Sequence, residues 1–245
     1  MNRREYIRLQ NLGIAALFTP HIETEWSWSP SVERLMGIDP PKLFGQEKTQ
    51  LTRRAYKAFN RMKMAAWNDG VGIRTVSSYR SYADQKRIFE RKFQAFTQEG
   101  DSGEDAIERI IEYSTLPGTS RHHWGTDIDI IQAGRTVDGD CLLEEHFEPG
   151  GAFAALKEWL DQNATDFDFY LVYTKDANRK GFNYEPWHLS YAPESVGLLK
   201  NYLRKEVINR VLAEKVIGYN HLSEARLNRC LEEPLLGIKP KLLPQ

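Results

Sequence analysis

Two short stretches of the sequence hold imidazoles and carboxylates at a spacing that suits a metal ion. The stretch SRHHWGTDID offers an imidazole at His122 and a carboxylate at Asp129. The stretch EPWH offers a second imidazole at His188 and a further carboxylate at Glu185. Two histidines and one aspartate are a common ligand set for a catalytic zinc ion, whose fourth position is left to water. The sequence therefore predicts one zinc ion held by three side chains, with Glu185 free to act as a base.

This ligand set indicates a catalytic rather than a structural zinc site. A closed structural site usually has four protein ligands that include cysteine, and neither Cys141 nor Cys230 lies near the two stretches. A zinc ion lowers the pKa of its bound water from about 15.7 to about 7 and polarises a carbonyl group. Glu185 would take the proton from that water and deliver it to a leaving amine. Arg80 would meet the negative charge that grows on the carbonyl oxygen.

Hydrophobic periodicity indicates the elements that position these residues. Helices are expected over residues 32–36, 47–68, 82–96, 103–114 and 152–163. Strands are expected over residues 71–78 and 167–174, with a further, alternating half-buried strand at GTDIDII. Residues 182–191 are expected to form an extended aromatic segment. In the alternating strand, Asp127 and Asp129 face the same side. On a flat strand Glu185 and His188 would face opposite sides, so the chain around Pro186 must twist, bulge or turn.

The 245 residues are expected to form one α+β domain with a small antiparallel sheet that carries the ligands and helices packed around it. Residues 1–40 are expected to form an N-terminal helix and a Trp- and Pro-rich connection. Residues 41–192 form the domain that carries the site, and residues 193–245 form a helical C-terminal extension packed on it. No motif in this extension indicates a role.

The N-terminal residues allow two interpretations. NRREYIR followed by LGIAALF resembles a twin-arginine export signal over residues 1–18. The apolar part is short, however, and no A-x-A cleavage site follows it, so we favour an amphipathic helix.

Composition restricts the classes of partner. With 33 Lys and Arg against 34 Asp and Glu, the net charge of -1 gives no electrostatic signature of nucleic-acid binding. No apolar run reaches the roughly 18 residues that a membrane span needs. The two cysteines fit neither a CxxC metal site nor a disulfide-rich scaffold. A small or neutral partner is expected, and the oligomeric state is left open.

Three motifs together resemble the VanY-like D-alanyl-D-alanine carboxypeptidases, zinc peptidases of bacterial cell-wall metabolism related in fold to the hedgehog signalling domain. The motifs span residues 71 to 191 in the family's order. The pattern SxHxxGxxxD is matched by Ser120, His122, Gly125 and Asp129, ExWH by Glu185, Trp187 and His188, and YRSxxxQ by Tyr79, Arg80, Ser81 and Gln85.

The resemblance implies a role for each matched residue. It implies His122, Asp129 and His188 as zinc ligands, Glu185 as the catalytic base and Arg80 as the group that stabilises the transition state. It implies substrate binding by Ser120, which is similar to a serine that helps hold a terminal carboxylate, and by Tyr79, Gln85 and Trp187. The sequence departs from the family pattern at Asp127, where many relatives have a small residue, usually Ala.

Less specific interpretations apply to several residues nearby. His21, His123, His146 and His221 are each expected to be structural or surface histidines, and for His123 the alternative is support of the neighbouring ligand. Asp127 is expected to support the ligands rather than bind metal. Trp124 and Trp187 are expected to pack around the site. Arg80 could instead form a surface ion pair, and Arg121 or Arg179 could bind a substrate carboxylate.

The leading hypothesis is a zinc D,D-carboxypeptidase that removes the terminal D-Ala from peptidoglycan stem peptides. L,D-carboxypeptidase, D-Ala-D-Ala dipeptidase and peptidoglycan endopeptidase activities with the same site are alternatives, as is a non-catalytic zinc-containing cell-wall binding module. The presence of both Glu185 and Arg80 favours the enzyme, since a pure binder needs neither. The substrate class favours the cell envelope or periplasm, and the cytoplasm is the alternative.

Overall fold

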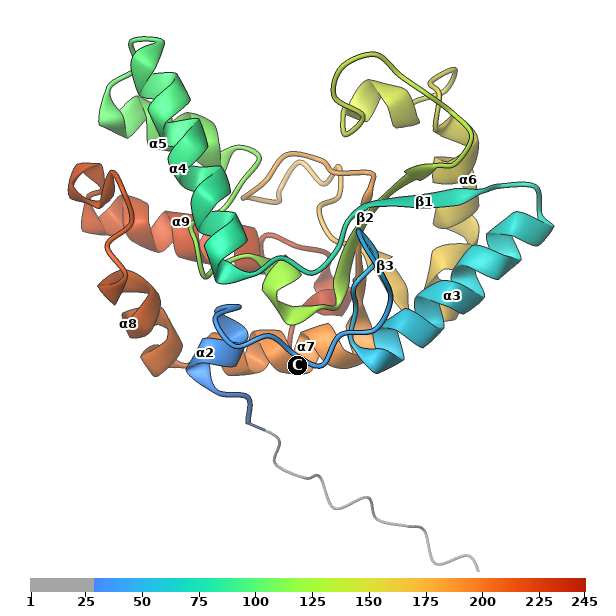
Figure 1. Cartoon of the computed structure of the whole chain (residues 1–245), viewed down its shortest axis with the longest axis horizontal. Coiled ribbons are helices and arrows are strands. Elements are labelled where there is room, and N and C mark those ends of the chain that lie inside the picture. The colour runs from blue at the N-terminus through green and yellow to red at the C-terminus, as the bar shows by residue number, and fades with distance from the viewer. Residues whose placement is uncertain (1–28) are drawn as a thin grey trace, which may run out of the picture.

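The computed structural model describes residues 29–245. The predicted N-terminal helix and export signal lie outside the described residues. The structure is a four-stranded antiparallel sheet surrounded by helices, in the strand order β1-β2-β4-β3 (Figure 1). The α+β prediction with a small antiparallel sheet is confirmed. The strands are β1 (Ile73–Ser77), β2 (Asp127–Gln132), β3 (Phe169–Leu171) and β4 (His188–Tyr191).

Among the described residues, seven α-helices run for at least nine residues and an eighth, α2, has four, and all the predicted helices from residue 32 onward are present. They are α2 (Val32–Leu35), α3 (Arg53–Asn68), α4 (Tyr82–Gln98), α5 (Gly103–Ile111), α6 (Ala154–Asn163), α7 (Ala192–Tyr202), α8 (Lys205–Ala213) and α9 (Glu224–Leu236). Short 3-10 turns follow at η1 (Arg121–Trp124), η2 (Glu144–Phe147), η3 (Ala164–Phe167), η4 (Tyr219–His221) and η5 (Pro240–Leu242).

The start of α3 differs from the prediction of a helix from residue 47. The chain before it folds back on itself through a bridge between Phe44 and Leu51, and the helix begins only at Arg53. The start of α4 follows its sequence closely. The Ser81 hydroxyl accepts a hydrogen bond from the Asp84 amide while the Asp84 carboxylate reaches back to Ser81, which is a capping box. This cap fixes where the chain leaves β1 and enters the helix.

Two hydrophobic clusters lie on either side of the sheet. In Figure 1, α3 and α6 lie on one side of the sheet, and α4, α5, α8 and α9 lie on the other. The first cluster joins α3 and α6 to the apolar side chains of β2 and β4, among them Ile128, Ile130 and Leu189. The second cluster runs from Leu35 to Leu242 and holds the C-terminal helices against the rest of the chain.

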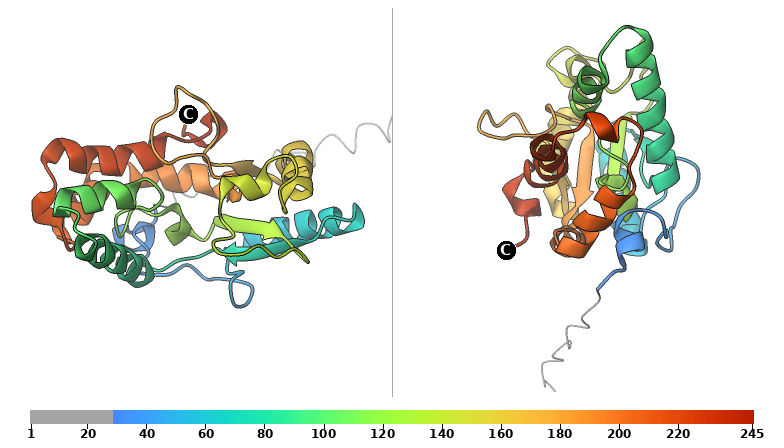
Figure 2. Two further views of the ribbon diagram at one scale, coloured as in Figure 1. Left: turned by 90° about the horizontal axis from the view of Figure 1, so that it is seen from above. Right: turned by 90° about the vertical axis from the view of Figure 1, so that its left-hand side faces the viewer.

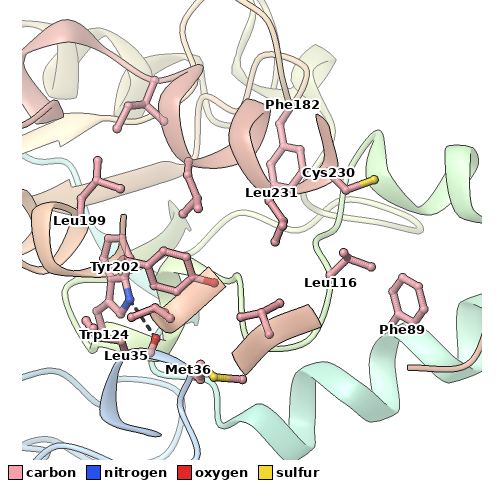
Figure 3. Close-up of a cluster of buried hydrophobic side chains, with 14 of the residues drawn as sticks. Leu35, Met36, Phe89, Leu116, Trp124, Phe182, Leu199, Tyr202, Cys230 and Leu231 are labelled. Atoms are coloured by element: carbon pink, nitrogen blue, oxygen red, sulfur yellow. Dashed lines mark hydrogen bonds between the residues drawn. The ribbon is translucent and has the colours of Figure 1, made fainter. Parts of the chain in front are cut away.

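Figure 3 shows the second cluster at close range. Trp124, from η1, packs against Tyr202 of α7 with ring centroids 5.9 Å apart, and its indole N–H donates to the Leu35 carbonyl. Leu231 and Cys230 of α9 lie in the same cluster. Residues from the first described helix, from the turn before β2 and from the tail therefore share one core. The two views in Figure 2 show the tail helices lying alongside α4 and α5.

The end of α9 packs closely against the loop over residues 176–184, and a glycine on each side allows this close approach. A Cβ added at Gly237 would collide with the Lys180 carbonyl, and one added at Gly181 would collide with the Glu233 carbonyl. Gly181 also has a φ of +95°, which L side chains rarely adopt. The two backbones can approach this closely only because neither position carries a side chain. Among residues 29–245, no helix is long and apolar enough to span a membrane.

Candidate metal centre

The two central strands, β2 and β4, place polar and apolar side chains on opposite faces of the sheet. Asp129 lies directly across from His188, and Asp127 lies across from Ser190. Because side chains alternate along a strand, these four residues share one face while Ile128 and Leu189 share the other. We call Asp127, Asp129, His188 and Ser190 the floor. All four are buried, at 0–5% exposure.

His122 completes a metal-binding cluster with two floor residues. Its Nε2 lies 3.4 Å from an Asp129 carboxylate oxygen, and its ring stacks on that of His188 with centroids 4.8 Å apart. One ligand atom from each of His122, Asp129 and His188 lies within 4.8 Å of the others. The predicted zinc ligands, from two distant stretches of sequence, therefore converge on one point.

A neighbouring backbone group sets the orientation of the His122 ring. His122 Nδ1 lies 2.7 Å from the Ser78 carbonyl, which can only accept, so Nδ1 carries the proton. Nε2 is therefore the nitrogen that faces Asp129 and is the one available to a metal. The chain leaves β1 through an irregularity between Thr75 and Ser77, directly before this carbonyl. Gly125, with a φ of 71°, ends η1 and turns the chain from His122 into β2.

The His188 ring is held from both of its nitrogens. Nε2 lies 3.2 Å from the Asp127 carboxylate, while Nδ1 lies 2.9 Å from Glu185 and 3.9 Å from Asp129. Burial lowers the pKa of His188, but its hydrogen bonds to Asp127 and Glu185 and the Asp129 charge outweigh this and raise the pKa to about 10. Because Nε2 is bound to Asp127, Nδ1 is the nitrogen that faces Asp129 and the cluster.

Asp129 provides the test of whether a cation fits this site. Burial raises the pKa of Asp129, but the neighbouring His122 outweighs it, so the pKa is lowered and the group is a carboxylate. Its Oδ1 is buried and has no hydrogen-bond partner among the described residues. A buried carboxylate oxygen without a partner is costly unless something positive binds it. Two imidazole nitrogens and one carboxylate suit a zinc ion.

Glu185 reaches the cluster through a turn, as the alternation argument requires. The His188 amide donates to the Glu185 carbonyl at 3.2 Å, which closes a turn over Pro186 and Trp187 immediately before β4. The segment expected to be extended from residue 182 is therefore a strand only from His188 onward. The turn brings the carboxylate of Glu185 against His188 Nδ1, where it faces the open side of the cluster.

Arg80 lies beside the cluster and is held in place by two side chains. Its guanidinium donates to Gln85 Oε1 at 2.9 Å and to Ser77 Oγ at 3.1 Å. Gln85 is fully buried and donates in turn to Ser114 Oγ and to the Thr115 carbonyl. Arg80 makes no ion pair with a described carboxylate, so its charge is directed at the cleft rather than at a surface partner.

His123 supports Arg80 through the backbone. Its Nδ1 lies 2.7 Å from the Arg80 carbonyl, and its Nε2 accepts from the Gly118 amide at 3.2 Å. Burial lowers the pKa of His123 to about 3, so the ring is neutral and holds both bonds. His123 is therefore a buried structural histidine whose contacts hold the backbone at Arg80 and Gly118.

The cluster lies in a cleft of about 980 Å³. Of the residues predicted to act there, those that line the cleft are Arg80, Ser120, His122, Asp129, Glu185, Trp187 and His188. Gln85 lies behind Arg80, and Tyr79 is not among the lining residues, so their predicted substrate contacts stay predictions. Trp187 packs against Phe147 with ring centroids 5.8 Å apart.

Parts of the cleft carry no recognisable sequence signal. One edge is formed by four acidic side chains that we call the acidic rim, namely Asp140, Glu144, Glu145 and Glu148. Lys175 pairs with Glu144 at 2.5 Å and with Glu148 at 2.6 Å. Lys92 from α4 and Pro234 from α9 also line the cleft. Only their place in the fold brings these residues to the site.

The remaining histidines lie away from the cluster or outside the described residues. His21 belongs to the latter. His146 contacts the Asp140 carbonyl, and His221 lies near Phe93. Arg179 donates to the backbone carbonyls of the loop and of Gly237 rather than lining the cleft.

Comparison with known proteins gives a family match over most of this region. A family model described as VanY, D-alanyl-D-alanine carboxypeptidase, matches residues 48–194. A D-alanyl-D-alanine carboxypeptidase of Enterococcus faecalis is 29% identical over 128 residues, which make up 52% of this chain and 42% of that protein. The chain spans about half the length of the curated relatives it matches.

Two solved structures share the fold. The LdcB LD-carboxypeptidase is 26% identical with a TM-score of 0.50, and the match covers 80% of each chain. A Zn(II) complex of a mutant of the vancomycin resistance D,D-pentapeptidase VanY is 24% identical with a TM-score of 0.51. That match covers 70% of this chain and 90% of the other.

Proposed function

Because the chain belongs to the VanY D-alanyl-D-alanine carboxypeptidase family, we propose that it is a zinc-dependent D,D-carboxypeptidase that hydrolyses the terminal D-Ala bond of peptidoglycan stem peptides. The observation that carries the proposal is the convergence of His122, Asp129 and His188 at a cleft, with an unpartnered carboxylate oxygen on Asp129 and the Glu185 carboxylate on the open side. The Zn(II) complex of a protein with the same fold supports the choice of metal.

The ligands would be His122 through Nε2, His188 through Nδ1 and the carboxylate of Asp129. A bound zinc ion supplies a water of lowered pKa and a Lewis acid for the scissile carbonyl. Glu185 takes a proton from the attacking water and returns it to the leaving amine, since its carboxylate lies beside the ligands and lines the cleft. Arg80, fixed by Gln85 and Ser77, donates to the carbonyl oxygen as negative charge develops there.

Substrate binding would involve the wall that carries Ser120. Ser120 directly precedes Arg121, the first residue of η1, and it lines the cleft together with Thr119. A hydroxyl that is not used as a helix cap is free to donate to a terminal carboxylate. Trp187 offers an apolar surface next to the same ligands.

A second candidate is an L,D-carboxypeptidase that acts on tetrapeptide stems with the same site. It is favoured by the likeness to the LdcB LD-carboxypeptidase, which covers 80% of each chain. Dipeptidase and endopeptidase activities would use the same metal ligands and base. A binding module without catalysis is disfavoured because Glu185 and Arg80 both line the cleft beside the ligands.

The test is to incubate zinc-loaded protein with tetrapeptide and pentapeptide stems and to identify released amino acids by mass spectrometry. A D,D-carboxypeptidase releases D-Ala from the pentapeptide only, whereas an L,D-carboxypeptidase releases it from the tetrapeptide. Glu185→Ala serves as the control, and equal cleavage by this variant would remove the assigned base. Release from neither stem by the zinc-loaded protein would contradict both candidates.

We also propose that the protein acts in the cell envelope, because the family's substrate belongs there. Cell fractionation with antibody detection would test this, and recovery in the cytoplasmic fraction alone would favour an action on recycled fragments.

A further inference from the structure

The side chain at the position where this sequence departs from the family pattern, Asp127, is enclosed by hydrogen-bond donors. Its Oδ2 accepts from Arg121 Nε at 2.8 Å and from His188 Nε2 at 3.2 Å. Its Oδ1 accepts from Thr126 Oγ1 at 2.8 Å and from Ser190 Oγ at 2.7 Å. A carboxylate has about four acceptor sites, and all of them are used here. An asparagine could not replace it, because its amide nitrogen would face donors.

Arg121 forms the other half of a closed ring. Its Nη2 donates to Ser190 Oγ at 2.8 Å, and that hydroxyl in turn donates to Asp127. The side chains of Arg121 and Asp127 are 1% and 0% exposed. The guanidinium also lies 4.8 Å from the ring of Trp124. Both charges are thus removed from water and matched with each other.

We propose that Asp127 is a positioning residue for the metal centre, holding His188 through its Nε2 proton so that Nδ1 faces the position a metal would take between His122 and Asp129. The role of Arg121 is to hold the Asp127 charge in place. The hydrogen bond to His188 supports this, because it comes from the nitrogen that faces away from the cluster. A ligating histidine is commonly oriented in this way by a carboxylate on its other nitrogen.

The competing explanation is that Asp127 exists only to neutralise Arg121. The two explanations predict different zinc affinities for a variant that lacks both Asp127 and Arg121. Replacing a buried ion pair by apolar residues is often tolerated, whereas removing one partner leaves an uncompensated charge. Asp127→Ala/Arg121→Leu should therefore fold nearly as well as the unmodified protein. If Asp127 positions His188, this double variant still lacks the bond to Nε2.

The experiment uses the full chain and Zn(II) alone, without substrate. Zinc affinity is measured by competition with a chromogenic chelator, and unfolding of the metal-free protein is followed by circular dichroism. We expect Asp127→Ala to lower both stability and affinity. We expect the double variant to recover stability while its zinc dissociation constant stays about 10–100-fold higher than that of the unmodified protein. Zinc binding by the double variant as tight as in the unmodified protein would overturn the proposal.

A matched control removes a second Asp–Arg pair away from the cleft. Arg109 donates to Asp101 at 2.6 Å on the surface near α5. Asp101→Ala/Arg109→Leu should leave the zinc dissociation constant unchanged. A loss of affinity in this control equal to that of the Asp127→Ala/Arg121→Leu variant would count against a specific role for Asp127.

A second measurement does not depend on whether a variant folds. In the unmodified protein labelled with ¹⁵N-histidine and loaded with zinc, two-bond correlations should show His188 protonated at Nε2 and bound through Nδ1. A zinc-bound His188 protonated at Nδ1 would overturn the proposal. The inference rests on the proposed function only for the identity of the metal, so a protein that binds zinc in this way but cleaves neither stem would contradict that function alone.

Discussion

The floor of the cleft and its acidic rim are built in opposite ways. On the floor, Asp129 and His188 are 5% and 4% exposed, and His188 is held by Asp127, which is itself held by further hydrogen bonds. On the rim, Glu144 and Glu148 have side chains that are 46% and 44% exposed and share one lysine. Rigid burial suits groups that must keep a fixed geometry during chemistry, while exposed pairs can adjust to different ligands. We therefore expect the floor to determine turnover and the rim to determine substrate binding.

The strongest test of this difference removes a floor ligand. His188→Ala should abolish zinc binding at micromolar metal and reduce hydrolysis by about 10³-fold or more, because the metal supplies several kcal/mol of transition-state stabilisation. Metal content is measured by mass spectrometry and rates by D-Ala release. His146→Ala, near the rim, is the matched control and should keep both. Zinc retained at full occupancy in His188→Ala would mean that His188 is not a ligand.

The next largest effect is expected for a substitution of the proposed base that leaves the three metal ligands in place. Glu185→Gln should lower kcat by about 10²–10⁴-fold, the usual contribution of a general acid–base group. The zinc content should stay unchanged, because the three ligands remain. A loss of metal together with activity would instead make Glu185 a fourth ligand.

A third test concerns a group held beside the floor rather than on it. Arg80→Met should lower kcat by about 10²–10³-fold with a smaller change in KM, since the guanidinium acts on charge that develops in the transition state. Gln85→Leu should give a weaker effect of the same kind, because Gln85 acts by holding Arg80. Steady-state kinetics on stem peptides measures both. An effect of Arg80→Met on KM alone would reassign Arg80 to substrate binding.

On the rim, a smaller effect of a different kind is expected. Lys175→Ala removes the ammonium group that pairs with both Glu144 and Glu148. It should change the free energy of unfolding by less than about 1 kcal/mol, because these ion pairs are exposed. It should alter KM several-fold in a salt-dependent way and leave kcat unchanged. A fall in kcat comparable to that of Arg80→Met would remove the distinction between rim and floor.

The smallest expected effects concern the two cysteines, of which Cys141 follows the rim residue Asp140 and Cys230 lies in the second hydrophobic cluster. Burial raises the pKa of Cys230 to about 11, whereas Cys141 is partly exposed beside the rim. A thiol reagent at pH 8 should label Cys141 and spare Cys230. Because the folded protein favours the protonated Cys230 thiol, stability present below about pH 9 should fall as the pH rises through about 11. Mass spectrometry and pH-dependent unfolding check these two outcomes, and rapid labelling of Cys230 would contradict its burial.

Local sequence patterns were sufficient to predict much of this floor. Alternation placed Asp127 and Asp129 on one face, and the requirement for a turn at Pro186 followed from the spacing of Glu185 and His188. Both depend on neighbours in the chain. The cross-strand pairing of Asp129 with His188 joins residues far apart in sequence, and the sequence predicted only that both bind one metal ion, not that their strands are neighbours.

Other contacts could not be predicted, for two physical reasons. The ring of Arg121, Asp127 and Ser190 depends on tertiary contacts that leave no periodic signal. The approach of Pro234 to the cleft depends on how α9 packs, and its carbonyl accepts from the buried Tyr173 hydroxyl at 2.9 Å. The onset of α3 was misplaced because tertiary packing folded residues 44–51 back before the helix.

The contact of Gly181 with α9 and of Gly237 with the Lys180 backbone has a consequence for engineering the protein. The loop over residues 176–184 ends with Asn183 and Tyr184 and leads directly to Glu185, so we expect a methyl group at either glycine to displace the proposed base. Truncation of the C-terminal helices would remove the α9 backbone against which this loop packs. We therefore expect removal of α9 to change the loop that carries Glu185 and not only the C-terminal core.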